Sequence, residues 1–364
     1  MIKYLGSKRR LVPLLAAVAE ALGARTALDL FTGTTRVAQA LRSTGATVTA
    51  VDTARYAEVL ARTYVAWDPT PAEQLEVAEA IAGLAALPGR AGYVTDVFCT
   101  QARYFHPDNG VRIDAIREAI ARDHAGTWRE PILLTSLLEA ADRVDSTTGV
   151  QMAYLKQWAP RALRPLELRR PTPVEGPAGR AIRGDAEAMA GRVGPVDLAY
   201  LDPPYNQHRY FTNYHVWETL VAWDQPPHYG VACKRLDARD PSTASDFNRR
   251  RHMPGALQAC IDAVDARVVV VSYNDEAWLS LEDLAGMVAA RGPATVLAVD
   301  SKRYVGAQIG IHDPAGRKVG TVSHLRNTEY VVVAGDLMAG ERAAIERVAS
   351  HHGARSVTGV TLGP

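Results

Sequence analysis

Apolar and polar positions follow two different patterns along the chain. From Thr26, ALDLFTGTTRVAQALRSTGATVTAVDT reads as a short apolar strand, a Gly/Thr turn, an amphipathic helix and a second strand ending in an acid. Comparable strand signals return in PVDLAYLD, ARVVVVSY and EYVVVAG, with helical stretches between some of them. The pattern predicts an α/β fold with a mixed, mostly parallel sheet.

Between Pro71 and Leu168 the pattern becomes helical. Segments such as VRIDAIREAIARDH and ILLTSLLEAADRV have helical periodicity and no convincing strand signal, and PTPVEGPAGR, from Pro171, reads as the connection back. We therefore expect a helical insertion at 91–175 within an α/β domain formed by 1–90 and 176–364.

Composition narrows the class of protein. With 364 residues and 47% hydrophobic side chains, the chain can bury a large core. Its three cysteines lie far apart and in no zinc-like spacing, which favours buried thiols in a reducing cytoplasm. The apolar runs are strand-length, and the histidines form no H-E-x-x-H pattern, so we expect neither a membrane span nor a metal. The formal charge of +1 neither demands nor excludes a nucleic-acid partner.

The segment LDPPY, from Leu201, follows the apolar run VDLAY. Two consecutive prolines continue neither a sheet ladder nor a helix, because each lacks the backbone donor. The strand must therefore end there, and it leaves the Asp202 carboxylate, the Pro203 carbonyl and the Tyr205 ring in a stiff segment.

The first strand–turn–helix unit offers a second candidate site. Gly33 in the turn would let a ligand approach the backbone closely, and Asp52 at the end of the second strand could bind a ribose. The turn is not a G-x-G-x-x-G, however, and short glycine turns after strands are common. This pattern alone favours a purely structural turn.

Three motifs occur in a specific order: KYLGSK from Lys3, LDLFTG around Asp29, and LDPPY. They resemble the hallmarks of the Dam-like group of DNA adenine-N6 methyltransferases, which are K-W/Y-x-G-x-K, F-x-G-x-G and D-P-P-Y. The segments FTNYH, SYNDE at Ser272 and HLRNTEYVVV are also similar to family segments, so the resemblance covers most of the chain. Thr35 takes the place of the second glycine, where we expect a small side chain to be tolerated.

The resemblance implies an S-adenosylmethionine-dependent methyltransferase (Rossmann-like) sheet, with the helical insertion as the target-recognition region. It implies methyl transfer from S-adenosyl-L-methionine to the N6 amine of an adenine flipped out of a specific duplex DNA sequence. The context would be restriction-modification or phage/host modification. Duplex DNA is then the partner, and a cognate restriction endonuclease is a further candidate.

The resemblance also assigns site residues. The catalytic group would be Asp202, Pro203, Pro204 and Tyr205. In this group the Asp202 carboxylate and the Pro203 carbonyl accept the amine hydrogens, and Tyr205 stacks on the base. The cofactor would contact Tyr4, Lys8, Asp29, Phe31, Gly33, Asp52, Asp185 and Asp202. Asp52 and Asp185 could instead be helix or turn caps, and Tyr4 and Lys8 could be surface residues of a frayed terminus.

Basic clusters are the candidates for phosphate contacts. One consists of Lys156, Arg161, Arg164, Arg169 and Arg170, with Glu167 as the acid among them, and Arg249–Arg251 forms another. Either could equally be a solvated face.

Other functions remain open at this stage. They are an RNA-base methyltransferase, a protein-glutamine methyltransferase and a catalytically dead nucleic-acid-binding homologue. The leading aspartate of DPPY, KYLGSK and the large insertion favour DNA adenine, and an intact DPPY argues against a dead enzyme.

Overall fold

The computed structural model describes residues 2–4, 6, 8–204, 207, 209–302, 311–312, 318–320 and 326–357. The chain forms two compact units, each assembled from three separate stretches. Unit 1 comprises Met1–Ser7, Thr32–Asp185 and His208–Ser245, and unit 2 comprises Lys8–Phe31, Ala186–Gln207 and Asp246–Pro364. Residues distant in the sequence therefore meet within each unit.

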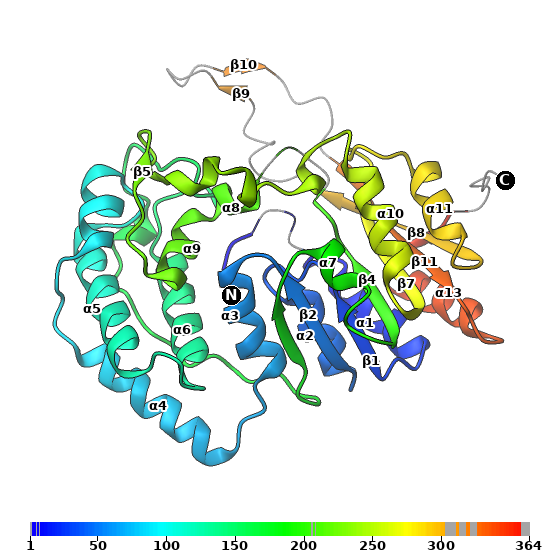
Figure 1. Cartoon of the computed structure of the whole chain (residues 1–364), viewed down its shortest axis with the longest axis horizontal. Helices are drawn as coiled ribbons and strands as arrows, with labels where there is room; N and C mark the ends of the chain where they lie inside the picture. Colours follow the sequence, from blue (N-terminus) through cyan, green and yellow to red (C-terminus); the bar gives the residue numbers. More distant parts are fainter. Residues whose placement is uncertain are drawn as a thin grey trace. The chain divides into compact units, whose positions relative to one another are not determined.

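Unit 2 is built on a sheet with the strand order β12-β8-β11-β7-β4-β1. Figure 1 labels these strands except β12. These strands are β12 (Arg355–Ser356), β8 (Ala294–Lys302), β11 (Arg326–Gly335), β7 (Ala266–Asn274), β4 (Val196–Leu201) and β1 (Thr26–Asp29). β1, β4 and β7 run parallel, whereas β7, β11, β8 and β12 pair antiparallel. Val268 to Val271 of β7 are almost fully buried, which explains their uninterrupted apolar run.

Five α-helices lie among the described residues of unit 2. They are α1 (Val12–Ala21), α7 (Ala186–Ala190), α10 (Met253–Ala263), α11 (Leu281–Ala289) and α13 (Glu341–His351). α1 packs against α13, and α10 packs against α7 and α11. A short 3₁₀ turn, η6 (Asp246–Asn248), precedes α10, and β9 (Ile311–His312) pairs separately with β10 (Lys318–Gly320).

Unit 1 joins a parallel strand pair to a helical block. The pair is β2 (Thr47–Asp52) and β3 (Arg180–Arg183), accompanied by α2 (Arg36–Ser43), α3 (Arg55–Ala61) and the π-helical η1 (Arg62–Ala66). The block contains α4 (Pro71–Ala86), the π-helical η2 (Val94–Gln101), α5 (Pro107–Asp123), α6 (Glu130–Arg143), η3 (Pro160–Leu163), α8 (Tyr210–Asn213) and α9 (His215–Ala222). The hairpin β5 (His228–Tyr229) and β6 (Lys234–Arg235) follows, with 3₁₀ turns η4 (Leu236–Arg239) and η5 (Pro241–Thr243).

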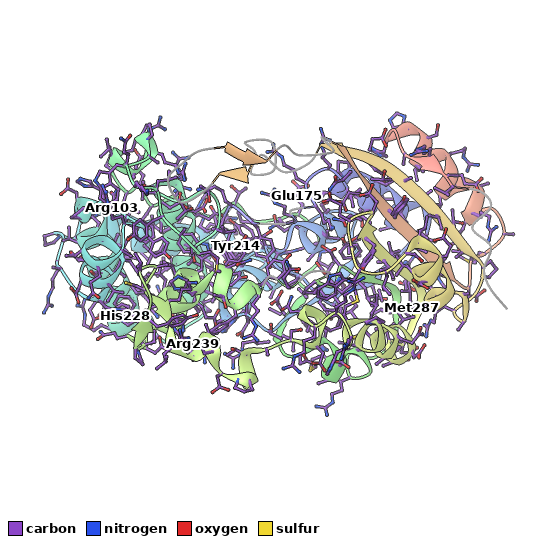
Figure 2. All side chains as sticks on the ribbon, turned by 90° about the horizontal axis from the view of Figure 1, so that it is seen from above. Arg103, Glu175, Tyr214, His228, Arg239 and Met287 are labelled. Carbon is purple, nitrogen blue, oxygen red and sulfur yellow. The ribbon has the colours of Figure 1, made fainter. Side chains whose placement is uncertain are left out.

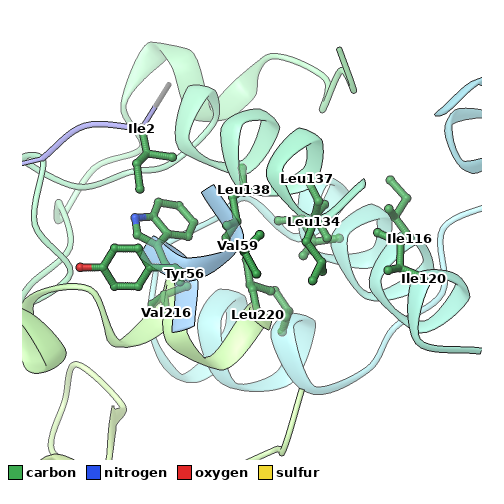
Figure 3. Packing of buried hydrophobic residues seen from close by; sticks show 14 of the residues in the cluster. Ile2, Tyr56, Val59, Ile116, Ile120, Leu134, Leu137, Leu138, Val216 and Leu220 are labelled. Atoms are coloured by element: carbon green, nitrogen blue, oxygen red, sulfur yellow. The ribbon is translucent and has the colours of Figure 1, made fainter. Parts of the chain in front are cut away.

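The core of unit 1 joins the helical block to α3. Figure 3 shows Val59 of α3 among Leu134 and Leu138 of α6 and Leu220 of α9, all of them buried. These three helices pack against one another pairwise. The helical block therefore shares one apolar core with the helix that follows Asp52.

Most of the predicted elements are present. The fold class is confirmed: the chain is a mixed α/β protein, VRIDAIREAIARDH lies mostly in α5 and ILLTSLLEAADRV in α6. The three cysteines are buried, as expected. The division at residues 91 and 175 stays a prediction, since the compact units follow other bounds. Among the described residues, no helix combines the length and apolarity that a membrane span requires.

Candidate active site

β4 delivers Asp202 to the carboxyl edge of the sheet of unit 2. The strand ends at Leu201, which pairs with Val271 of β7, and Asp202, Pro203 and Pro204 leave the ladder as expected from the two missing backbone donors. Asp29 ends the neighbouring parallel strand β1 and is fully buried opposite Tyr200. Tyr205 lies outside the described residues.

Asp202 belongs to a charged cluster that Lys8 organises. Lys8 Nζ lies 3.0 Å from Asp202 Oδ1 and 3.2 Å from Glu329 Oε2 of β11, and Ser272 Oγ of β7 donates a hydrogen bond of 2.9 Å to the same Oδ1. The Lys8 side chain is only 7% exposed, against 19% for Asp202 and 18% for Glu329. One sheltered ammonium therefore serves two carboxylates.

Burial and the Lys8 charge have opposite effects on the pKa values of the two carboxylates. Burial raises the pKa of Asp202, and the nearby Lys8 ammonium and the Ser272 hydroxyl oppose that rise. Burial also raises the pKa of Glu329, with Lys8 opposing it and the charge of Asp202 adding to it. Lys8 thus keeps an acceptor carboxylate available at the end of β4.

Unit 1 contains the second group of predicted residues. Asp52 Oδ2 accepts a hydrogen bond of 2.8 Å from the Gly33 N–H, and Oδ1 accepts one of 2.9 Å from the Ala54 N–H. Burial raises the pKa of Asp52, and the backbone N–H groups of Ala54, Gly33 and Thr53 oppose that rise. Gly33 is left-handed (φ 50°), and a Cβ there would lie 3.2 Å from Cε1 of Tyr4. Asp52 therefore holds the turn together through backbone N–H donors on both sides of β2's end.

Thr35 occupies a backbone conformation suited to glycine. Its φ of 63° is left-handed, which costs a non-glycine residue about 1–2 kcal/mol. Its hydroxyl donates to the Thr34 carbonyl at 2.6 Å and accepts from Gln39 Nε2 at 2.8 Å. These bonds offset the strain of a threonine at the position of the second glycine of the family motif.

Tyr4 is part of an aromatic cluster in unit 1. Its ring stacks on Tyr214 with centroids 4.7 Å apart and on Tyr210 at 5.2 Å, with Tyr56 tilted at 6.5 Å. Tyr214, labelled in Figure 2, comes from the FTNYH segment. Packing between these rings fixes Tyr4, so the frayed-terminus alternative is wrong for this residue.

The remaining cofactor candidates are distributed over both units. In unit 1, Asp185 is exposed and follows β3, whose Arg183 pairs with Asp52, so both acids lie at the carboxyl edge of the strand pair. In unit 2, Phe31 meets Phe247 edge to face, with centroids 4.9 Å apart. Tyr4, Gly33, Asp52 and Asp185 thus lie in unit 1, and Lys8, Asp29, Phe31 and Asp202 in unit 2. Their cofactor roles stay predictions.

The candidate DNA-binding residues differ in their surroundings. Arg161 lies 2.7 Å from Asp145 and also donates to the Thr147 carbonyl, so it braces a loop. Arg169 pairs with Glu167, and both are exposed. The side chains of Lys156, Arg164 and Arg170 are exposed as well. Phosphate contacts stay a prediction, now better suited to the exposed residues than to Arg161.

Sequence reasoning assigned no role to three residues that surround Asp202. Ser272 and Glu329 lie in SYNDE and HLRNTEYVVV, two segments that resemble the family, and Tyr200 lies in the strand that leads to Asp202. Their presence in those motifs was the available signal. Among the described residues, no group of three or more His, Cys, Asp or Glu side chains is arranged to hold a metal ion.

Comparison with known proteins agrees with the family resemblance of the three motifs. The family model for D12 class N6 adenine-specific DNA methyltransferases matches residues 4–286. The chain is similar to the type II methyltransferase M.NlaIII of Neisseria lactamica, with 27% identity over 322 residues, 83% of this chain and 92% of that protein. It is also similar to the type II methyltransferase M.CviAII of Paramecium bursaria Chlorella virus 1, with 32% identity over 58% of this chain and 64% of that protein. The type II methyltransferase M.FokI of Planomicrobium okeanokoites is 30% identical over 52% of this chain and 29% of its own length.

Replacing Lys8 tests the charged cluster. Lys8→Met should lower the free energy of unfolding by about 3 kcal/mol at neutral pH, because two sheltered carboxylates lose their cation. Without Lys8 both carboxylates have raised pKa values in the folded state, so the deficit relative to wild type should grow as pH rises and shrink as pH falls. Urea unfolding at pH 5 and pH 8, with the exposed Lys156→Met as control, measures this. A deficit that is the same at both pH values would contradict it.

Two substitutions separate strain from hydrogen bonding at Thr35. Thr35→Val keeps the left-handed strain and loses both hydroxyl bonds, so unfolding free energy should fall by about 2 kcal/mol. Thr35→Gly removes strain and bonds together and should stay within about 1 kcal/mol of wild type. Equal losses for the two variants in urea unfolding would show that the left-handed backbone at position 35 stores no strain that glycine can relieve.

Proposed function

The chain belongs to the D12 class of N6 adenine-specific DNA methyltransferases, and on that premise we propose how its residues act. It transfers a methyl group from S-adenosyl-L-methionine to the N6 amine of an adenine flipped out of a specific duplex DNA sequence. The observation that carries this proposal is the Asp202 carboxylate at the end of β4, held by Lys8 and Ser272.

The chemistry requires a pair of hydrogen-bond acceptors. The lone pair of the adenine amine is delocalised into the ring, so the amine is a weak nucleophile. Asp202 and the Pro203 carbonyl each accept one amine hydrogen, which favours a tetrahedral nitrogen and stabilises its developing positive charge. The bound cofactor would supply the methyl group and keep the electron pair of the broken C–S bond on its sulfur, and the proton lost by the amine nitrogen would pass to solvent.

The described residues fit the cofactor. When bound, S-adenosylmethionine supplies the activated methyl group. The left-handed Gly33 lets the Tyr4 ring pack directly against the turn, and Asp52 ends β2 at the edge where a carboxylate suits ribose hydroxyls. Phe31 and Gly33 are separated by one residue, so both belong to the same strand-to-helix turn. Tyr4, Lys8, Asp29, Asp185 and Asp202 complete the proposed set.

The helical block supplies the target-recognition region of the proposal. Exposed Lys156, Arg164, Arg169 and Arg170 contact phosphates, whereas Arg161 shapes the loop through Asp145. The relatives are named type II methyltransferases and modification methylases, which supports a restriction-modification context. A cognate restriction endonuclease is then the expected partner activity.

Labelled methyl transfer tests the function. Incubated with tritiated S-adenosylmethionine, the protein should label duplex DNA at adenine N6, and neither RNA nor protein. Asp202→Asn keeps the side-chain shape, removes the charge, and should slow turnover by about 100-fold or more. Its DNA affinity should match wild type, because the interaction lost belongs to the transition state. Labelled RNA or protein, or wild-type turnover in Asp202→Asn, would refute the proposal.

Calorimetry tests the role of Asp52. Asp52→Asn should weaken S-adenosylmethionine binding by about 10-fold or more, as expected for a hydrogen bond to a charged acceptor. Asp197→Asn is the matched control, because Asp197 also accepts N–H bonds, from Arg25 and Thr26, at the start of β4. Equal affinities of the two variants for S-adenosylmethionine would show that Asp52 only stabilises the turn.

A further inference from the structure

Two hydroxyl groups connect the interior of unit 2 to Asp202. The Tyr200 hydroxyl lies 2.7 Å from Ser272 Oγ, and Ser272 Oγ donates to Asp202 Oδ1 at 2.9 Å. Tyr200 of β4 pairs with Val270 of β7, so Ser272, two residues further along β7, points to the same face of the sheet as Tyr200. Both side chains are almost fully buried. The parallel pairing of β4 and β7 therefore sets this geometry.

The hydrogens of this chain have one consistent direction. A serine hydroxyl has a single hydrogen, which Ser272 gives to the carboxylate, so the Tyr200 hydroxyl must donate to Ser272 Oγ. Burial and the nearby charge of Asp202 hold the pKa of Tyr200 well above its usual value, so its hydroxyl keeps its proton. Hydrogen bonds that polarise one another in this way strengthen the final bond to the carboxylate.

Both protein donors to Asp202 converge on one oxygen. Lys8 Nζ and Ser272 Oγ approach Oδ1 at 3.0 and 2.9 Å, from the amino-terminal segment and from β7. Two donors on one oxygen fix the rotation of the carboxylate. No hydrogen bond to Oδ2 occurs among the described residues, which leaves that oxygen for the adenine amine.

We propose that Tyr200 and Ser272 are positioning residues of methyl transfer, which turn the Asp202 carboxylate so that Oδ2 accepts the amine hydrogen. This inference rests on the catalytic role proposed for Asp202. Tyr200 acts only through Ser272, and Ser272 acts only through Asp202. Their removal should therefore slow the chemical step and leave the binding of DNA and cofactor unchanged.

The charges around Asp202 determine the expected pH dependence. Lys8 faces it from the amino-terminal segment, Glu329 of β11 faces Lys8, and Tyr200 of β4 faces Ser272, with Asp29 of β1 near Tyr200. The Ser272 bond favours the ionised form, so its loss raises the pKa of Asp202. Activity is lost as pH falls through that pKa, and the acid limb of the rate profile therefore moves to higher pH.

Single-turnover methyl transfer across a pH series tests the inference. Ser272→Ala should slow the step by about 10-fold and move the acid limb up by about one pH unit, as expected for one hydrogen bond to a charged group. Tyr200→Phe, which removes one oxygen, should also slow the step and raise the acid limb, but by smaller amounts than Ser272→Ala. Tyr273→Phe is the matched control: this neighbouring buried tyrosine of β7 accepts from the Leu279 N–H and should behave as wild type.

A second readout needs no methyl transfer. In protein with ¹³C-labelled aspartate carboxyl groups, the Asp202 resonance is the one lost in Asp202→Asn. Its titration midpoint should rise in Ser272→Ala and Tyr200→Phe and stay unchanged in Tyr273→Phe. Unchanged midpoints and rates in the first two variants would overturn the inference, even if wild type methylates DNA. Slower rates without a shifted midpoint would show that Tyr200 and Ser272 act only through packing and do not position the carboxylate. A wild type that labels no DNA would instead refute the proposed function.

Discussion

A single ammonium group, that of Lys8, sits between two carboxylates from distant parts of the chain. Asp202 follows β4, Glu329 lies on β11, and both approach Lys8 Nζ within 3.2 Å. Removing one member of such a sheltered group leaves an uncompensated charge, which costs more than the intact group contributes. The arrangement therefore fixes the amino-terminal segment, the end of β4 and β11 relative to one another within unit 2. It also keeps an ionised acceptor where the strand ends.

The edge of the sheet explains why the acceptor lies there. Parallel strands bring their carboxyl ends to one edge, which is where α/β proteins bind ligands. β1 and β4 deliver Asp29 and Asp202 to that edge, and Pro203 and Pro204 prevent β4 from continuing past it. Ser272 reaches the same point from β7. A methyl acceptor bound there meets a carboxylate whose rotation and charge are already set, so little reorganisation remains for the reaction itself.

Local sequence patterns predicted much of the fold and the position of Asp202, whereas long-range strand pairing determined the surroundings of Asp202. Apolar runs and the two prolines are local signals, so β4, β7 and the position of Asp202 followed from the sequence. The surroundings of Asp202 did not, because Ser272 reaches Asp202, and Glu329 reaches Lys8, only through the register of β7 with β4 and β11. The charge pattern predicted a phosphate contact for Arg161. It could not reveal the loop fold that places Asp145 beside this residue. The left-handed Thr35 was visible only as a departure from a glycine motif.

A crystal structure of the protein with duplex substrate and a non-reactive cofactor analogue would show directly which oxygen of Asp202 accepts the adenine amine. We expect a flipped adenine whose N6 lies about 3 Å from Asp202 Oδ2 and from the Pro203 carbonyl oxygen, with Lys8 and Ser272 still on Oδ1. An adenine still stacked in the duplex would contradict the proposed role of Asp202. So would an N6 that contacts Oδ1 in place of Lys8 and Ser272.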